Sequence, residues 1–315
     1  MGCNGTNEEM IECAKTIDPK TALDKADEYF YMRANHGVAQ FTFLPVVDNY
    51  FLEEEPINLL NRGKFKKCPI LTGANKDEGN WLFVYAFPEY RNFSARPDFD
   101  YDTFKDFLTS LYHFYPQFPS TSSKSVMQAI QYRYTNWNNV DNSMKNFENF
   151  DEAAGDFHFL CPVVDFASTY ALNDQNVFLY YFTQRSSKHL WPEWMGVMHG
   201  DELSFVFGEP LNPNKNFTEE EKVLTRKILK YWSNFVRYDD PNKNLDGLSE
   251  TETLSQYIEP WPKFKVNKNS TYDEQRAYLN LNSKEISIGY NLRAEYCAFW
   301  GSFLPNLVIN ECKSF

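Results

Sequence analysis

Apolar residues recur at helical spacing in several segments of this chain. A helix is predicted after Thr218, because Thr218 and Glu221 have the sequence of a capping box. The apolar stripe that follows has a period close to 3.6 residues and should face the core; it consists of Leu224, Ile228, Tyr231, Trp232 and Phe235.

Other segments show the same helical signals. Thr6 and Glu9 form a second capping box, which predicts a helix through about Ile17 that Asp18 and Pro19 end. Helical patterns also occupy residues 102–115, 121–136, 143–173 and 292–307.

Short apolar runs predict strands. The sequence "KCPILTGANKDEG" (67–79) predicts a buried strand that enters a turn, because four apolar residues are followed by Gly73 and a polar cluster. Further strands or extended runs are predicted at 41–48, 177–185 and 275–282. Strands that alternate with helices indicate an α/β fold with a mostly parallel sheet. Three or four strands are few for 315 residues, which is consistent with part of a larger sheet outside the sequence.

Composition narrows the functional classes. Aromatic residues make up 17% of the chain, which fits either a bulky interior or an aromatic-lined cleft. A net charge of −12 argues against nucleic acid as a partner, because such proteins need a basic surface. There is no internal repeat or low-complexity tract, and residues 239–256 are interpreted as a loop. The chain therefore forms one domain in this interpretation.

The cellular compartment has two competing interpretations. Four glycosylation sequons, at Asn4, Asn92, Asn216 and Asn269, favour an extracellular protein with oxidised cysteines. The N-terminus lacks the apolar segment of a signal peptide, and instead Gly2 and Thr6 match a myristoylation pattern in which Cys3 is available for palmitoylation. We favour the first interpretation, in which the chain is a fragment without its N-terminal part.

No cofactor or metal site is predicted. The sequence contains no Cys-x-x-Cys pair, His-Glu-x-x-His motif, P-loop or Gly-x-Gly-x-x-Gly motif, and its five histidines show no ligand spacing.

Nucleophilic catalysis remains a candidate chemistry. Glu78 follows a predicted strand, and His199 lies downstream in "GVMHGDE", which is the acid-then-histidine order of α/β-hydrolases. A carboxylate next to an imidazole fixes its tautomer and stabilises its cationic form. The pattern alone is a weak signal, because Glu78 also fits a turn carboxylate and His199 an ordinary loop histidine.

A family resemblance supports the catalytic interpretation. The chain resembles the cholinesterases, within the type-B carboxylesterases, over essentially its whole length and in collinear order. The segments that carry the resemblance are "GANKDEGNWLFVYAFP", "GDFHFLCPVVDFA", "VFLYYFTQR", "WPEWMGVMHGDELSFVFGEPLN", "WSNFVRYDDPN" and "YCAFWGSFLPNL". The segment "HGDE" after "WMGVM" is more similar to invertebrate than to vertebrate members of the family, which includes the acetylcholinesterases.

The resemblance implies a fold and an activity. Residues 1–315 would be a single partial α/β-hydrolase domain, its C-terminal part, without the N-terminal strands and the nucleophile elbow. Glu78 and His199 would be the acid and the base of a Ser-Glu-His triad that hydrolyses choline esters. No Gly-x-Ser-x-Gly pentapeptide occurs in the sequence, so the serine would lie upstream of residue 1 and this chain alone would be inactive.

The resemblance also implies residues that contact substrate. Trp81 and Tyr85 would line the gorge, with Trp81 holding a quaternary ammonium by cation–π attraction, and Trp191 would form part of its wall. Ala39 and Phe41 match the acyl-pocket pair. Ala39, and Leu82 beside Trp81, depart from the vertebrate pattern, which puts strict acetyl selectivity in doubt.

The cysteine assignments follow from the resemblance as well. Cys3 with Cys13 and Cys161 with Cys297 match two family disulfides. Cys68 would be a free thiol in the buried strand, and Cys312 would either link two subunits of a homodimer or pair with nothing. Any membrane attachment would use segments outside this chain, because its tail carries no anchor signal.

Two functions from different classes follow. The first is an extracellular choline ester hydrolase, secreted or attached to the cell surface, whose partner is a small-molecule substrate. The alternative is a non-catalytic cholinesterase-like adhesion module. Retention of Glu78, His199 and the aromatic residues favours the enzyme, since adhesion needs none of them.

Overall fold

The computed structural model describes residues 2–33, 44–86, 95–112, 124–243, 259–266 and 276–312. Its centre is a four-stranded sheet in the order β1-β2-β3-β4. The first three strands are parallel, and β4 runs antiparallel to β3. The strands are β1 (Ile70–Asn75), β2 (Val177–Phe182), β3 (Ala277–Leu281) and β4 (Ser287–Tyr290). The α/β fold with a mostly parallel sheet is therefore confirmed; β4 had no counterpart in the sequence analysis.

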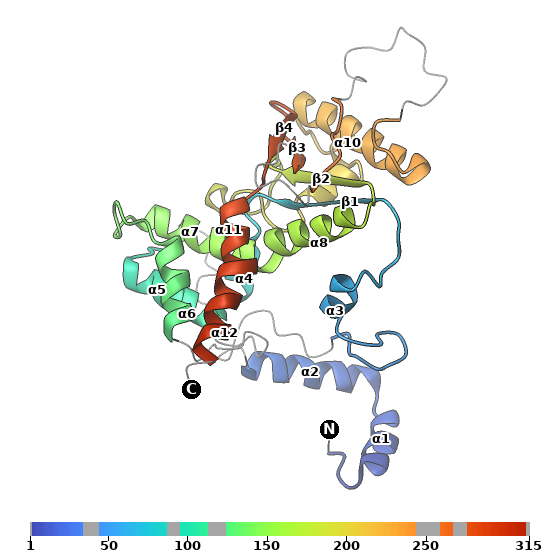
Figure 1. Ribbon diagram of the computed structural model, residues 1–315, viewed down its shortest axis with the longest axis vertical. Helices are drawn as coiled ribbons and strands as arrows, with labels where there is room; N and C mark the ends of the chain where they lie inside the picture. The colour runs from blue at the N-terminus through green and yellow to red at the C-terminus, as the bar shows by residue number, and fades with distance from the viewer. Residues whose placement is uncertain are drawn as a thin grey trace.

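Helices surround this sheet (Figure 1). The α-helices are α1 (Asn7–Lys15), α2 (Pro19–Arg33), α3 (Pro56–Asn61), α4 (Gly79–Ala86), α5 (Tyr101–Tyr112), α6 (Lys124–Tyr134), α7 (Ser143–Gly155), α8 (Cys161–Leu172), α9 (Glu202–Val206), α10 (Glu219–Tyr238), α11 (Ala294–Ala298) and α12 (Leu304–Cys312). Two π-helical turns, η3 (Asp156–Leu160) and η7 (Phe299–Phe303), each join two of these helices.

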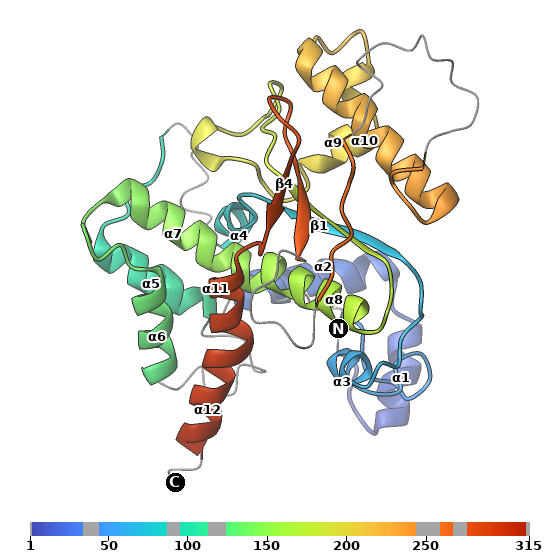
Figure 2. The ribbon, with the colours of Figure 1, turned by 45° about the horizontal axis from the view of Figure 1, so that its top comes forward.

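The sheet separates two apolar cores. Alternate residues of β2 point to opposite faces, so Val177 and Leu179 contribute to one core and Phe178 and Phe182 to the other. Helix α8 covers the first face and α10 covers the second, as Figures 1 and 2 both show. The first core continues among α5, α6, α7 and the C-terminal helices α11 and α12. The result is a three-layer arrangement with β2 at its centre.

Helix α10 follows its sequence prediction closely. Thr218 and Glu221 form the expected capping box. Leu224, Ile228 and Tyr231 are buried in the second core, and the remaining stripe residues, Trp232 and Phe235, pack against it. The stripe is therefore core, as expected.

The long predicted helix at 143–173 is one continuous helical segment with a change of winding in its middle. Helix α7 passes into the π-turn η3 and then into α8 without a break. Arg293 donates from Nε to Asp156 Oδ1 at 2.9 Å, and the Tyr134 hydroxyl donates to Asp156 Oδ2 at 2.8 Å. These bonds fix the first residue of the π-turn, which matters for the candidate site below.

The N-terminal helices differ from prediction at one boundary. Pro19 does not end α1 but begins α2, where proline is tolerated because its missing N–H has no helical partner. Asp18 Oδ2 accepts a hydrogen bond from the Thr21 N–H at 3.0 Å and so caps that helix. Helices α1 and α3 bury no residue. They lie with α2 at the end of the molecule away from α10 (Figures 1 and 2).

The strand predicted within 67–79 needs a correction, and the extended run predicted at 41–48 forms no strand in its described part. Residues 44–48 are exposed and form no strand, and 41–43 lie outside the described residues. Strand β1 is less buried than predicted: only Ala74 and Asn75 are buried, and the preceding four residues are partly exposed. Cys68 is a free, partly exposed thiol just before β1 rather than a core residue of the strand. Within the described residues β1 is an edge strand, which explains its partial exposure.

Among the described residues two disulfides are present, and they are the pairs that the resemblance implied. Cys3 bonds to Cys13 across α1, and Cys161 bonds to Cys297, which joins the start of α8 to α11. Across the part of the chain that the structure describes, no helix has the length and apolar character needed to cross a membrane.

We predict unequal contributions of the two disulfides to stability. Replacing Cys161 and Cys297 by Ala should lower the free energy of unfolding by about 5 kcal/mol, because the bond spans 136 residues and restricts the unfolded chain. The control is the pair Cys3→Ala and Cys13→Ala, which should barely move the urea midpoint because α1 buries nothing. Urea unfolding measures both, after peptide mapping without reduction verifies the bonds; equal effects would contradict the prediction.

Candidate active site

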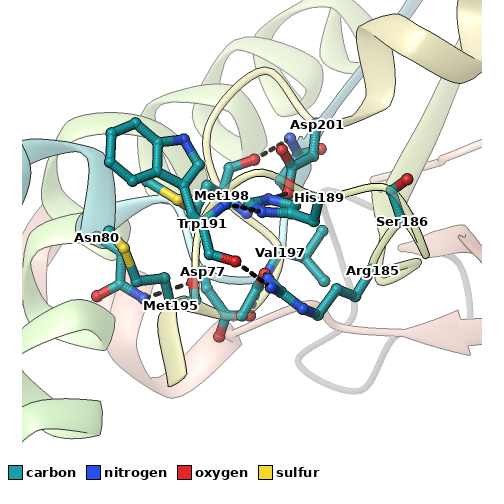
Figure 3. A network of polar contacts seen from close by, with 12 residues as sticks. Asp77, Asn80, Arg185, Ser186, His189, Trp191, Met195, Val197, Met198 and Asp201 are labelled. Carbon is teal, nitrogen blue, oxygen red and sulfur yellow. Dashed lines mark hydrogen bonds and ion pairs between the residues drawn. The ribbon is translucent and has the colours of Figure 1, made fainter. Parts of the chain in front are cut away.

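Two loops meet where the parallel strands β1 and β2 end. The acid loop, Lys76 to Glu78, follows β1, and the histidine loop, residues 183–201, follows β2. Since neighbouring parallel strands end at the same edge of a sheet, the two loops lie side by side. The Asp77 N–H donates to the Val197 carbonyl at 2.9 Å, and the Val197 N–H donates back to Asp77 Oδ2 at 2.7 Å. This reciprocal pair of bonds (Figure 3) fixes one loop against the other.

The two predicted catalytic residues are hydrogen-bonded. His199 Nδ1 lies 2.7 Å from Glu78 Oε2, although 121 positions separate them in the sequence. Glu78 Oε1 accepts a hydrogen bond from the Asn75 N–H at 2.7 Å. The Glu78 side chain is 7% exposed, whereas that of His199 is 43% exposed. A buried carboxylate held on both oxygens thus orients an imidazole whose other edge is accessible.

His199 occupies a tight turn. The Asp201 N–H donates to the Met198 carbonyl at 3.1 Å, which closes a four-residue turn with His199 and Gly200 at its centre. Gly200 has φ +86°, a left-handed conformation that glycine adopts without the steric strain of a side chain.

Asn75 links both loops to a second carboxyl group. Its side-chain amide donates to the Met198 carbonyl at 2.7 Å and to Glu202 Oε2 at 2.6 Å. Asn75 is buried, and Glu202 is the first residue of α9. The last residue of β1 therefore holds the first residue of the histidine turn and the side chain of the residue that follows the turn.

Aromatic rings pack around the imidazole. The ring centroids of Phe159 and Trp81 lie 4.6 Å and 5.5 Å from that of His199. Trp81 is also in an edge-to-face arrangement with Phe159 at 6.3 Å. Phe159 belongs to the π-turn η3, so the change of helical winding directs its ring to the site.

The local charges favour the protonated imidazole. The hydrogen bond to Glu78 raises the pKa of His199; partial burial opposes this, and the charges of Glu78 and Glu202 add to it. Burial raises the pKa of Glu202, and its bond from Asn75 opposes that shift. An imidazole with Nδ1 bound to a carboxylate can take a proton at Nε2 and be stabilised as the cation.

Asp77 of the acid loop and Asp151 of α7 form a pair of carboxyl groups that is largely shielded from water. Burial raises the pKa of Asp77, and burial together with the charge of Asp77 raises the pKa of Asp151 well above its ordinary value. Both line a cavity of about 490 Å³ that is also lined by Glu78 but not by His199. Asp151 is 5% exposed, so its ionised form would be costly.

The other predicted site residues have different outcomes. Ala39 and Phe41 lie outside the described residues, as do the side chains of Leu82 and Tyr85, whose backbone belongs to α4. Trp191 is 36% exposed, and its carbonyl accepts a hydrogen bond from Arg185 Nη2 at 2.6 Å. Its predicted role in a gorge wall stays a prediction.

The predicted glycosylation sites and Cys312 can be placed only in part. Asn4 and Asn216 are exposed, whereas Asn92 and Asn269 lie outside the described residues, as does the side chain of Cys312. Among the residues that the structure describes, no group of three or more His, Cys, Asp or Glu side chains could hold a metal ion.

Sequence reasoning missed three residues of this site: Asn75, Phe159 and Glu202. Asn75 lies within "GANKDEG" and Glu202 is the last residue of "GVMHGDE", so both motifs contained a usable signal. Phe159 lies within the quoted segment "GDFHFLCPVVDFA", but the direction of its ring depends on the π-turn, which the sequence pattern does not indicate.

Known proteins resemble this chain over almost its whole length. The model of the carboxylesterase family matches residues 1–300. The chain is 33% identical over 309 residues to an acetylcholinesterase of Bungarus fasciatus, covering 98% of this chain and 46% of that protein. It is 36% identical over 308 residues to a cholinesterase of Mus musculus, which covers 98% of this chain and 46% of that protein. An acetylcholinesterase of Electrophorus electricus is 32% identical over 338 residues, with 98% and 50% covered. The chain thus spans about half the length of these relatives.

The buried carboxyl pair generates a prediction on stability against pH. An acid whose pKa is raised by folding stabilises the protein below its ordinary pKa of 3.8, and this contribution is lost as pH rises toward the raised value. The variant Asp151→Asn has no ionisable group at this position, so it does not lose this part of the free energy of unfolding. We therefore expect the variant to gain free energy of unfolding relative to the native protein as pH rises from about 4 to about 7.

Urea unfolding at a series of pH values measures this difference. Asp141→Asn, at an exposed position, is the control and should track the native protein at every pH. A difference between Asp151→Asn and the native protein that does not change with pH would contradict the prediction.

Proposed function

The chain belongs to the carboxylesterase family, and on that premise we propose that residues 1–315 are one partial α/β-hydrolase domain of a serine esterase that hydrolyses choline esters. Glu78 is the acid and His199 the base of its catalytic triad. The family itself indicates ester hydrolysis; the triad, the choline ester and the position of the serine are the content of the proposal.

The observation that carries the proposal is the Glu78–His199 pair. A carboxylate at 2.7 Å from Nδ1 fixes the tautomer in which Nε2 has a free lone pair. Within the described residues no hydrogen bond to Nε2 is recorded, and the side chain is 43% exposed, so this nitrogen is available to a hydroxyl group. A structural histidine needs neither a buried carboxylate partner nor an accessible second nitrogen.

The reaction follows from this geometry. His199 Nε2 removes the proton of a serine hydroxyl as its oxygen attacks the ester carbonyl carbon. The imidazolium that forms is stabilised by Glu78, and it then gives the proton to the departing alcohol oxygen, which leaves an acyl-enzyme. Water attacks the acyl group by the same route and releases the acid, and the proton returns to the serine oxygen.

The nucleophile is proposed to be a serine in polypeptide upstream of residue 1. Two facts support this: the sequence has no Gly-x-Ser-x-Gly pentapeptide, and it spans about half the length of its relatives. The strands that would continue the sheet beyond β1 belong to the same upstream part in this proposal, since β1 is an edge strand within the described residues.

The substrate class rests on Trp81 and on the relatives. Trp81 is partly exposed beside His199, and an indole face attracts a quaternary ammonium group. The relatives named above are cholinesterases and acetylcholinesterases. Tyr85, Leu82 and Trp191 are proposed to complete the wall for the choline end, and Ala39 with Phe41 the pocket for the acyl group.

The protein is proposed to act outside the cell, secreted or attached to its surface. Two disulfides need an oxidising compartment, and the sequon residues Asn4 and Asn216 are exposed to a glycosylating enzyme. A disulfide of Cys3 also removes the thiol that palmitoylation would use. A homodimer through Cys312 and membrane attachment through other segments remain predictions.

The triad proposal is tested in a parent protein that carries the upstream segment. His199→Ala should lower kcat by about 10⁶-fold, since triad members act as a unit, and Glu78→Gln should lower it by about 10⁴-fold through the wrong tautomer. Glu78→Gln should also move the acid limb of the pH–rate profile to lower pH, because the bond to Glu78 raises the pKa of His199 and the base must be neutral.

Acetylthiocholine hydrolysis measures these effects. The 315-residue chain by itself should be inactive and prone to aggregate, because it lacks the serine and leaves the β1 edge unpaired. Full activity in the parent after His199→Ala would refute the base assignment, and activity in the short chain that needs His199 would refute the upstream serine. An inactive parent with the same folded structure would favour the adhesion module.

A second prediction concerns the acyl group. With Ala39 in place of an aromatic residue, the pocket has room for added methylenes, each worth about 0.8 kcal/mol when buried. The parent should therefore hydrolyse propionyl and butyryl esters at a sizeable fraction of its acetyl rate, and Ala39→Phe should abolish the butyryl activity first. Near-zero butyrylcholine turnover in the native parent would contradict this.

A further inference from the structure

The histidine loop contains a second histidine–carboxylate pair that the triad does not use. His189 Nε2 lies 2.6 Å from Asp201 Oδ2. The side chains are 4% and 17% exposed, so the pair is well shielded from water. Figure 3 shows it on the opposite side of the loop from Asp77.

The backbone determines which nitrogen of His189 carries the proton. The Trp191 N–H donates to His189 Nδ1 at 3.0 Å, so Nδ1 must present a lone pair. The proton of the neutral ring is then on Nε2, which donates it to the Asp201 carboxylate. His189 therefore acts as a bridge between the backbone of Trp191 and the side chain of Asp201.

The same carboxylate oxygen holds the turn of His199. Asp201 Oδ2 also accepts the Met198 N–H at 2.8 Å, and the Asp201 N–H donates to the Met198 carbonyl at 3.1 Å. These two bonds close the turn whose central residues are His199 and Gly200. Asp201 can hold Met198 only if its side chain keeps one rotamer, and the bond from His189 selects that rotamer.

The bridge itself is anchored to the scaffold. Two residues before His189, the Ser187 N–H and hydroxyl donate to the two oxygens of Glu221, each at 2.6 Å. Glu221 is 1% exposed and belongs to the capping box of α10. Arg185 donates to the carbonyls of Gly196 at 2.5 Å and of Trp191 at 2.6 Å. A continuous series of bonds thus runs from the N-terminus of α10 to the turn that carries His199.

We propose that His189 and Asp201 are positioning residues that hold His199 Nε2 in the geometry needed for proton transfer. The proposal rests on the proposed esterase function, and neither residue touches the reacting atoms. Glu78 fixes the imidazole through Nδ1 from the side of β1, and the His189–Asp201 pair fixes the backbone of the same residue from the side of α10. The base is therefore held at two independent points.

The test uses the parent protein with the upstream serine and three variants. His189→Phe removes both ring nitrogens. His189→Gln keeps a donor near the position of Nε2, and Asp201→Asn keeps an oxygen that accepts from Met198 but loses the charge. His189→Phe should lower kcat by up to about 100-fold with little change in KM, because small displacements of a catalytic group are this costly. His189→Gln should recover most of the loss, and Asp201→Asn should fall between them.

A spectroscopic readout separates positioning from general destabilisation. The His199 Nδ1 proton, bonded to Glu78, should give a downfield proton resonance that exchanges faster with water in His189→Phe and recovers in His189→Gln. Ile130→Val, in α6 and fully buried, is the control: it should lower the melting temperature without changing kcat or this resonance.

The outcomes distinguish the two proposals. If the native parent is inactive, or if His199→Ala leaves its activity intact, the esterase proposal fails. The positioning proposal is then tested only by the exchange of the His199 Nδ1 proton resonance. If His189→Phe keeps the native kcat and the native exchange rate, the positioning proposal is wrong. It is also wrong if His189→Phe raises KM alone, or if His189→Gln recovers neither kcat nor the resonance.

Discussion

The parallel pairing of β1 and β2 is the constraint on which the candidate site depends. In-register pairing from Ile70 with Val177 to Asn75 with Phe182 makes both strands end at the same level. The residues that follow must then meet, and Glu78 reaches His199 although 121 positions separate them. The reciprocal bonds between Asp77 and Val197 extend this pairing one step beyond the sheet, so the two loops behave as one unit.

Buried polar groups set the shape of this unit. Glu78, Asn75 and Glu202 are all removed from water to a large degree, and each is costly to bury unless it is hydrogen-bonded. The Asn75 amide supplies some of these hydrogen bonds, because it donates to Glu202 and to the Met198 carbonyl. Such a network tolerates few alternative arrangements, because moving one loop would leave several buried groups without partners. Rigidity at His199 is thus a consequence of burial around it, even though the imidazole is accessible.

The helices on both faces of the sheet orient residues of the site as well as covering the sheet. The π-turn η3, fixed by Arg293 and Tyr134 through Asp156, changes the direction in which Phe159 points and brings its ring against His199. The Cys161–Cys297 bond follows immediately after this turn and ties it to α11. On the other face, the capping box of α10 holds Ser187 and so the start of the histidine loop. Both faces of the sheet therefore support the same few residues at its edge.

Local features of this protein were determined by the sequence alone. The capping boxes at Thr6 and Thr218, the core stripe of α10 and the extended backbone of each of the strands β1 and β2 depend on residues a few positions apart, and their side chains decide the local backbone. Order and motif made Glu78 and His199 candidates, which the family resemblance then supported, and the disulfide pairs followed from the resemblance. The tertiary structure decided what depends on distant partners: the meeting of Asn75 with Glu202, the direction of Phe159, and the partial exposure of β1 at a sheet edge. It also decided the tautomer of His189, because hydrogen bonds to two other parts of its loop select that tautomer, and a pattern of residue types does not contain them.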